Sequence, residues 1–257
     1  MAQQSLPERP DRSARLGRPV GATAAGKTAC GVVLLLPDGV PTGTRRPTSR
    51  SAAAMWSLAH GLAKAGRPEG LTAHVVRYRY RGWNGPAADP AQDAEWAVEE
   101  VVRRYGDVPI CLVGRGMGAR AALWAGGHPA VGSVLALAPW LPSQEAKLNP
   151  DPVKHLIGRR VLVVHGTNDA HTHPELSYRL VERAKKINSA VCRFEVHTDG
   201  HRLHQHRPEV YALAADFALG SLFDQDYARP LADALAAPPP LGLRMPLAAG
   251  FGASLRR

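Results

Sequence analysis

The segment that decides the fold is Val108-Pro-Ile-Cys-Leu-Val-Gly114-Arg115-Gly116-Met117-Gly118-Ala119-Arg120-Ala-Ala-Leu123. It begins with a short apolar run typical of a buried strand, continues through a glycine-rich turn, and ends in a helical pattern. In this context the pattern G-x-S-x-G forms a nucleophile elbow, in which a serine lies at the tip of a strained turn. Gly114 and Gly118 match the flanking glycines of that pattern. Gly116 stands where the serine is expected.

Two more candidate residues follow later apolar runs. The run Val161–Gly166 leads into Asp169, and the run Phe194–His197 leads into His201. The order nucleophile position, acid, histidine differs from that of the chymotrypsin and subtilisin proteases. Asp199 is a second candidate for the acid, although its closeness to His201 in the sequence favours a role in a turn.

The strand and helix signals alternate along the chain, which predicts an α/β fold with a doubly wound, mostly parallel sheet of about six strands and helices on both faces. We expect the folded domain at residues 30–225, after a flexible lead-in at 1–29 and before an Ala/Pro-rich, disordered tail at 226–257. In such sheets the site lies beyond the carboxyl ends of the strands. The predicted strands are Gly31–Leu36, Thr72–Tyr80, Pro109–Val113, Ser133–Ala138, Arg160–His165 and Val191–His197.

With these motifs in place, the region from about Gly31 to Leu222 resembles a small α/β-hydrolase of the dienelactone-hydrolase-like or esterase-like sort found in actinobacteria. The resemblance implies that Asp169 is the acid and His201 the base. It also implies an oxyanion hole formed by the N–H of Met117 and an N–H near Gly39. The strand count suggests a compact version that lacks the usual N-terminal hairpin, and residues 142–158 leave room only for a small cap. The other similar segments are Leu34-Leu-Leu-Pro-Asp-Gly39, Tyr78-Arg-Tyr-Arg-Gly-Trp83, Leu137-Ala-Pro-Trp-Leu-Pro142 and His165-Gly-Thr-Asn-Asp169.

Gly116 departs from the family pattern because it has no side chain to attack a carbonyl. Glycine adopts the strained backbone angles of the elbow without a Cβ clash, so the turn survives while the nucleophile is lost. The leading interpretation is a pseudo-hydrolase that binds a small molecule. The alternatives are an Asp169–His201 dyad that catalyses proton abstraction, elimination or cyclisation without a covalent intermediate, and an engineered Ser-to-Gly form of an active ester hydrolase. Gly116→Ser is expected to gain esterase activity if the rest of the site is intact.

Four residues near the strand ends are candidates for lining a substrate pocket. Arg115 precedes the elbow position and suits a carboxylate- or phosphate-bearing ligand. Tyr80, Trp83 and Trp140 follow strands, where aromatic rings bind apolar ligands or pack in the core.

The composition favours a globular protein, with 45% apolar and 21% charged residues. No secretory signal or membrane-spanning run is present, so a cytoplasmic protein is expected. The formal charge is +10, but no nucleic-acid-binding motif accompanies it, and we expect neither nucleic-acid nor membrane partners. The basic residues that crowd part of the chain are Arg45, Arg46, Arg50, Lys64, Arg67, Arg77, Arg79 and Arg81.

Three further patterns carry less weight. Gly21-Ala-Thr-Ala-Ala-Gly26-Lys27-Thr28 has phosphate-loop spacing, but a strand follows it where a helix is required. The histidines at 171, 173, 201, 204 and 206 form no recognised zinc signature, so no metal or other cofactor is expected. Cys30, Cys111 and Cys192 lack C-x-x-C spacing, and each is expected to be a small buried residue at or inside a strand.

Overall fold

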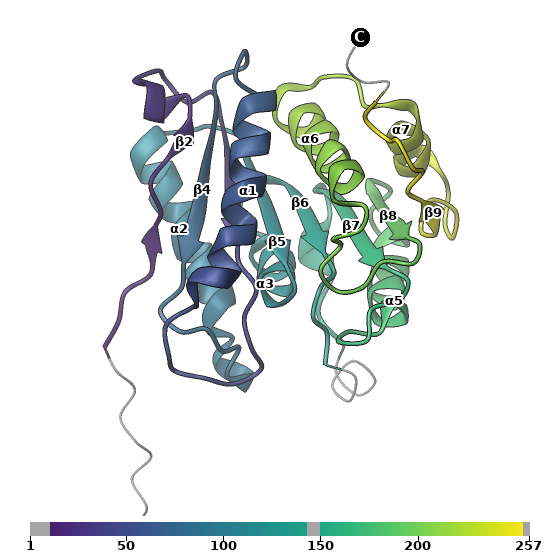
Figure 1. Cartoon of the computed structure of the whole chain (residues 1–257), viewed down its shortest axis with the longest axis horizontal. Coiled ribbons are helices and arrows are strands. Elements are labelled where there is room, and N and C mark those ends of the chain that lie inside the picture. Colours follow the sequence, from purple (N-terminus) through teal and green to yellow (C-terminus); the bar gives the residue numbers. More distant parts are fainter. Residues whose placement is uncertain (1–10, 143–149, 254–257) are drawn as a thin grey trace, which may run out of the picture.

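The computed structural model describes residues 11–142 and 150–253, without the side chains of residues 49 and 50. Within these ranges one nine-stranded sheet crosses the molecule in the order β1-β4-β3-β5-β6-β7-β8-β9, and β2 also pairs with β4 (Figure 1). The parallel centre of the sheet consists of β3 (Gly31–Leu36), β4 (Leu71–Arg77), β5 (Ile110–Arg115), β6 (Val131–Leu137), β7 (Arg160–Gly166) and β8 (Val191–Val196). The predicted mostly parallel sheet is therefore confirmed. The six predicted strands overlap these six, with ends that differ by up to three residues, and the sheet has three further short strands at its edges.

Helices cover both faces of the sheet because its strands are apolar on both sides. One face packs against α1 (Ser49–Ala65), α6 (Arg207–Phe223) and α7 (Arg229–Ala236). The other packs against α2 (Asp89–Tyr105), α3 (Met117–Ala125) and α5 (Pro174–Lys185). Short 3₁₀ turns lie at η1 (Thr23–Ala25), η2 (Gly85–Ala87) and η3 (Lys154–Leu156). The cap expected between residues 142 and 158 lies largely outside the described residues.

The predicted flexible lead-in is partly built into the sheet. The strands β1 (Arg15–Leu16) and β2 (Val20–Gly21) each pair antiparallel with β4. The backbone N–H of Gly17 donates to the carbonyl of Val75, and that of Ala22 donates to the carbonyl of Leu71. These two strands form because β4 offers an unpaired edge, and they are too short to show a periodic pattern in the sequence. Two separate short strands thus occupy the edge where the strand count suggests that a hairpin is missing.

The Ala/Pro-rich segment also differs from its expected disorder. It contains α7 and β9 (Met245–Pro246), and β9 pairs in parallel with β8. Leu231, Ala234 and Leu243 are fully buried. Burial of these apolar side chains, together with the pairing of β9 with the open edge of β8, stabilises this segment despite its disorder-prone composition.

Close approach of the backbone explains two of the glycines around residue 116. A Cβ on Gly114 would overlap the carbonyl oxygen of Gly118, and a Cβ on Gly118 would overlap the carbonyl oxygen of Leu36. The helix α3 therefore starts in direct contact with β3 and β5, as the sequence pattern predicted.

The cysteine predictions hold for two of three residues. Cys111 in β5 and Cys192 in β8 are buried and free, and burial raises the pKa of each thiol to about 12. Cys30 is exposed, because it lies just before β3 rather than within it. No helix among the described residues has the length and apolar character needed to span a bilayer.

Candidate active site at the carboxyl edge of the sheet

Residue 116 forms a sharp corner between β5 and α3. Gly116 has φ 54° and ψ −117°, a conformation that costs other residues strain because of their Cβ. Its N–H donates to the carbonyl of Leu137, and its own carbonyl accepts from the N–H of Trp140, both at 2.9 Å. The backbone thus turns sharply between β5 and α3 at a residue that has no side chain.

The carboxylate of Asp38 fills the space beside this corner. Asp38 follows β3, and its Oδ1 accepts hydrogen bonds from the backbone N–H groups of Met117 and Gly39, both at 2.8 Å. These two N–H groups are the ones that the sequence resemblance assigned to an oxyanion hole. The N-terminus of α3 also favours an anion at this position. The position expected for an oxyanion therefore holds a carboxylate from the protein itself.

The imidazole of His201 lies between two carboxylates. Its Nδ1 is 2.8 Å from Oδ2 of Asp169, and its Nε2 is 3.4 Å from Oδ2 of Asp38. Asp169 lies in the loop after β7, and His201 lies in the loop after β8. The structure thus brings together Asp169, His201 and Gly116, the residues predicted from the order of motifs, and adds Asp38 to them.

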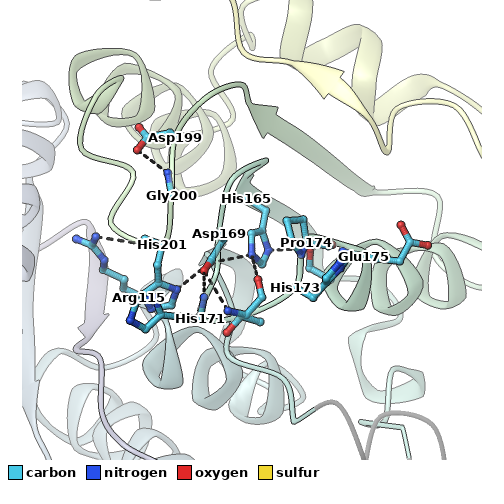
Figure 2. A network of polar contacts seen from close by, with 12 residues as sticks. Arg115, His165, Asp169, His171, His173, Pro174, Glu175, Asp199, Gly200 and His201 are labelled. Atoms are coloured by element: carbon cyan, nitrogen blue, oxygen red, sulfur yellow. Dashed lines mark hydrogen bonds and ion pairs between the residues drawn. The ribbon is translucent and has the colours of Figure 1, made fainter.

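A second imidazole lies on the other side of Asp169 (Figure 2). Nε2 of His165 is 3.1 Å from the same Oδ2 that contacts His201, and its Nδ1 is 2.8 Å from the hydroxyl of Ser177. Burial lowers the pKa of His165, despite its bond to Asp169. His165 is therefore neutral at pH 7, with its proton on Nε2 where Asp169 accepts it.

The other oxygen of Asp169 is held by the backbone. Oδ1 accepts from the N–H groups of His171 at 2.8 Å and Thr172 at 3.0 Å. Burial alone would raise the pKa of Asp169, but the hydrogen bonds from His165 and His201 hold it far below its usual range. Asp169 is thus a fixed anion that orients the ring of His201.

The charge on His201 follows from its two carboxylate neighbours. Burial alone would lower its pKa, but the hydrogen bonds to Asp169 and Asp38 outweigh burial and raise it to about 9. For Asp38, burial opposes ionisation, while the bonds from His201 and Met117 lower the pKa overall. At pH 7 the resting site therefore contains an imidazolium between two carboxylates.

Arg115 lies beside this group with little of its hydrogen-bonding capacity used. One of its terminal nitrogens is 3.5 Å from the carbonyl oxygen of His201. Burial lowers its pKa, and the charge of Asp38 partly offsets that effect. Among the described residues, no carboxylate comes within 4.0 Å of its guanidinium.

The aromatic residues predicted to line a pocket pack elsewhere. Trp83 is buried in the core, with the guanidinium of Arg120 4.1 Å above its ring and Trp124 at its edge. Trp140 packs against the same core, 5.3 Å from Arg120. Tyr80 is buried near Arg12. Core packing, the alternative role considered from the sequence, accounts for the positions of Trp83 and Trp140.

Asp199 stabilises a turn through its hydrogen bonds to backbone N–H groups and does not orient the ring of His201. Its Oδ1 accepts from the N–H groups of Gly200 and His204, and its Oδ2 accepts from that of His206.

The ring of His171 stacks on that of His201 with centroids 5.3 Å apart. In the parts of the chain that the structure describes, no group of three or more His, Cys, Asp or Glu side chains could hold a metal ion.

Sequence reasoning missed Asp38 and His165 as members of the site. Asp38 lies in the loop after the first long strand, and His165 lies at the end of the β7 strand. The sequence feature that could have identified Asp38 is a carboxylate next to the N–H expected to bind an oxyanion, in a chain that has no side chain at position 116.

No family model matches the sequence, and no curated protein is significantly similar to it. Solved structures do match. The esterase Est1E from Butyrivibrio proteoclasticus, with ferulic acid bound, has a TM-score of 0.60 at 11% identity, over 83% of this chain and 97% of its own. An esterase from Pyrococcus furiosus has a TM-score of 0.58 at 18% identity, over 76% and 84%. A putative α/β hydrolase from Agrobacterium tumefaciens has a TM-score of 0.59 at 14% identity, over 82% and 92%.

At these identities the likeness concerns the fold. Together with the sheet order and the strand-to-helix corner at Gly116, it shows that the chain has the α/β-hydrolase fold. Its structural neighbours are esterases and related hydrolases.

Proposed function

We propose that this chain is a hydrolase-fold protein in which a carboxylate has replaced serine chemistry. The observation that carries the proposal is the position of Asp38, with one oxygen in the oxyanion hole and the other facing His201. Residue 116 supplies no hydroxyl, and loss of a triad serine costs on the order of 10⁶ in kcat. Toward esters the chain is therefore a pseudo-hydrolase with a degenerate triad.

The same position of Asp38 supports chemistry through the retained dyad. His201 is oriented by Asp169 and faces a second carboxylate, so a proton can move between Nε2, Asp38 and a bound molecule. Pairs of ionisable groups with opposed pKa shifts are common in catalytic sites. Proton transfer to or from a small molecule is the minimum chemistry of this site.

Ligand binding without turnover is the second candidate function. The observation that favours it is that both N–H groups of the hole are already satisfied by Asp38. A small carboxylate could take the place of Asp38 by accepting the same two N–H hydrogen bonds, with no covalent step.

The interpretation as an engineered Ser-to-Gly form fits the geometry less well. A Cβ at position 116 would overlap both carboxylate oxygens and the Cγ of Asp38. A serine parent would therefore need a different conformation of Asp38, whereas glycine and aspartate fit together as they are.

Two assays test the proposal. With p-nitrophenyl acetate, the unmodified protein and His201→Ala are expected to show the same background rate and no burst; a burst that depends on His201 would contradict the loss of serine-type chemistry. With a panel of small enolisable ketones, followed by hydrogen–deuterium exchange at carbon, turnover is expected that both His201→Ala and Asp38→Ala abolish. Asp224→Ala, which removes an exposed carboxylate, is the matched control. Binding without turnover across the panel would instead support the second candidate.

A further inference from the structure

A cavity of about 490 Å³ lies at the edge of the sheet, between β1, the carboxyl end of β4 and the first turns of α1. This volume is within the range of roughly 300–1,000 Å³ that is usual for small-molecule sites. Asp38, Asp169 and His201 are not among its described lining residues. This edge cavity is therefore distinct from the candidate active site.

Much of the wall of the edge cavity is apolar. Trp56 of α1 is half-buried there, and Ala52 and Ala53 precede it by one turn on the same face of the helix. Val75 of β4 and Pro37 also line the cavity. The small side chains at positions 52 and 53 leave space that larger residues would fill, so an apolar chain can lie against the indole ring of Trp56.

Positive charge is concentrated at the same cavity. Its described lining includes five arginines and no aspartate or glutamate. Two of the arginines are engaged, since Arg79 pairs with Asp93 and Arg12 donates to the carbonyl of Thr44. The other three belong to exposed residues, and their guanidinium groups have no hydrogen-bond or ion-pair partner among the described residues; they are Arg15, Arg46 and Arg77. These three cations are available to an anion.

Two of these cations are neighbours across the sheet edge. Arg15 of β1 is the direct partner of Arg77 of β4 in their antiparallel pairing. Directly opposite residues have their side chains on the same face of a sheet, with Cβ atoms roughly 4.5–5.5 Å apart, and like charges at such positions repel each other. Guanidinium groups match the geometry of carboxylate and phosphate oxygens. An anion bound between Arg15 and Arg77 would therefore remove the repulsion and gain strong hydrogen bonds.

We propose that the edge cavity binds a small amphipathic anion, whose carboxylate or phosphate head group lies between Arg15 and Arg77 and whose alkyl chain lies against Trp56. This binding goes beyond the proposed function and is independent of the chemistry at His201. The formal charge of +10 favours the approach of such an anion.

The surroundings of the edge cavity favour a single soluble molecule over a membrane surface. Peripheral binding to a bilayer relies on apolar side chains that insert at the headgroup boundary. In the part of the chain that the structure describes, the large apolar residues that are exposed all lie outside the lining of the cavity; they are Val102, Ile157, Ile187 and Leu241. The apolar surface of this site is thus inside the cavity, where an alkyl chain can reach it.

Isothermal titration calorimetry with octyl phosphate and octanoate tests the proposal. Both anions are expected to bind at one site, and their relative affinities identify the preferred head group. Inorganic phosphate lacks the chain and 1-octanol lacks the charge, so each should bind about tenfold or more weakly.

Two arginine variants test the position of the head group. Arg77→Gln should weaken the binding of octyl phosphate about tenfold or more, because a charge-assisted hydrogen bond is lost. The variant also relieves the repulsion with Arg15, so it should remain folded, which circular dichroism verifies. Arg67→Gln removes an exposed charge before the amino end of β4 and is the matched control. It should bind octyl phosphate as the unmodified protein does.

The NMR signal of the Trp56 indole N–H, assigned with Trp56→Phe, locates the bound molecule. It should shift when octyl phosphate is added, both in the unmodified protein and in His201→Ala. Absence of saturable binding of either anion, or equal affinity in Arg77→Gln and the unmodified protein, would overturn the proposal. A loss of binding in His201→Ala with none in Arg77→Gln would also overturn it, because the anion would then lie beside Asp38. Association with vesicles of phosphatidic acid but not with octyl phosphate would overturn it in favour of a membrane surface.

Discussion

In the observed conformation, the carboxylate of Asp38 occupies the space that a side chain at position 116 would need. A Cβ built on Gly116 overlaps Oδ1 and Cγ of Asp38, while the same Oδ1 is bound by the N–H of Met117. The glycine at position 116 and the carboxylate beside it are thus parts of one arrangement.

This relationship changes the expected outcome of restoring the serine. Gly116→Ser alone should gain no esterase activity, because Asp38 blocks the hydroxyl and occupies the donors. Asp38→Ala together with Gly116→Ser should hydrolyse p-nitrophenyl acetate faster than either single variant, by on the order of 10²-fold, since His201 and the hole then serve a serine. Esterase activity in Gly116→Ser alone would show that Asp38 leaves the hole readily.

The pKa of His201 is expected to be about 9, measured by the NMR shift of its ring protons against pH. A pKa raised on folding adds stability that is complete below the unfolded value of about 6.5 and is lost as the pH rises toward 9. The free energy of unfolding should therefore fall across this window. The same fall should be absent in His201→Gln. A ring that titrates near its ordinary value in the native protein would contradict the imidazolium.

Removing one of the two carboxylates should lower that pKa. In Asp38→Asn, His201 keeps Asp169 but loses the hydrogen bond and the charge on its Nε2 side. Its NMR titration should shift toward neutral pH, and the unfolding curve should change only slightly because Asp38 is partly exposed. An unchanged titration would mean that Asp38 does not face His201 in solution.

Asp169→Ala should destabilise the fold much more than Asp199→Ala. The first removes the acceptor for the N–H groups of His171 and Thr172 and leaves the buried ring of His165 without its carboxylate. Unsatisfied buried donors cost about 1–3 kcal/mol each. Asp199 is buried as well, but its three N–H donors belong to half-buried or exposed residues, whereas Thr172 and His165 beside Asp169 are buried. Urea unfolding measures the difference. Equal losses in the two variants would argue against a buried network around Asp169.

Truncation after residue 224 should impair folding. The segment beyond that point covers the β8 edge with β9 and buries Leu231 and Leu243. An exposed sheet edge and apolar surface promote association, so size-exclusion chromatography should show aggregates. A monomeric truncated chain with unchanged thermal stability would support the disorder expected from the composition.

The sequence predicts the central part of the fold well because each long strand is apolar enough to stand out. The strand Gly31–Leu36 is placed without error, and the other central strands are placed within a few residues. The edges are missed for the opposite reason. Strands of two residues, such as β1 and β9, carry no periodicity of their own and form because a neighbouring strand offers unpaired backbone groups.

The candidate site shows the same division. The positions of Asp169 and His201 follow from chain order, since the ends of parallel strands meet at one edge of the sheet. The role of Asp38 depends on a contact across 79 residues, from its carboxylate to Met117. The sequence alone does not show that a side chain from one loop has turned into the space that another residue left empty.

The shared space also couples the residue at position 116 to the conformation of Asp38. A serine at this corner would require the Asp38 carboxylate to turn away from its present position, because the two overlap as they stand. Ester cleavage at this corner would therefore depend on two changes together, a hydroxyl at position 116 and another place for the Asp38 carboxylate.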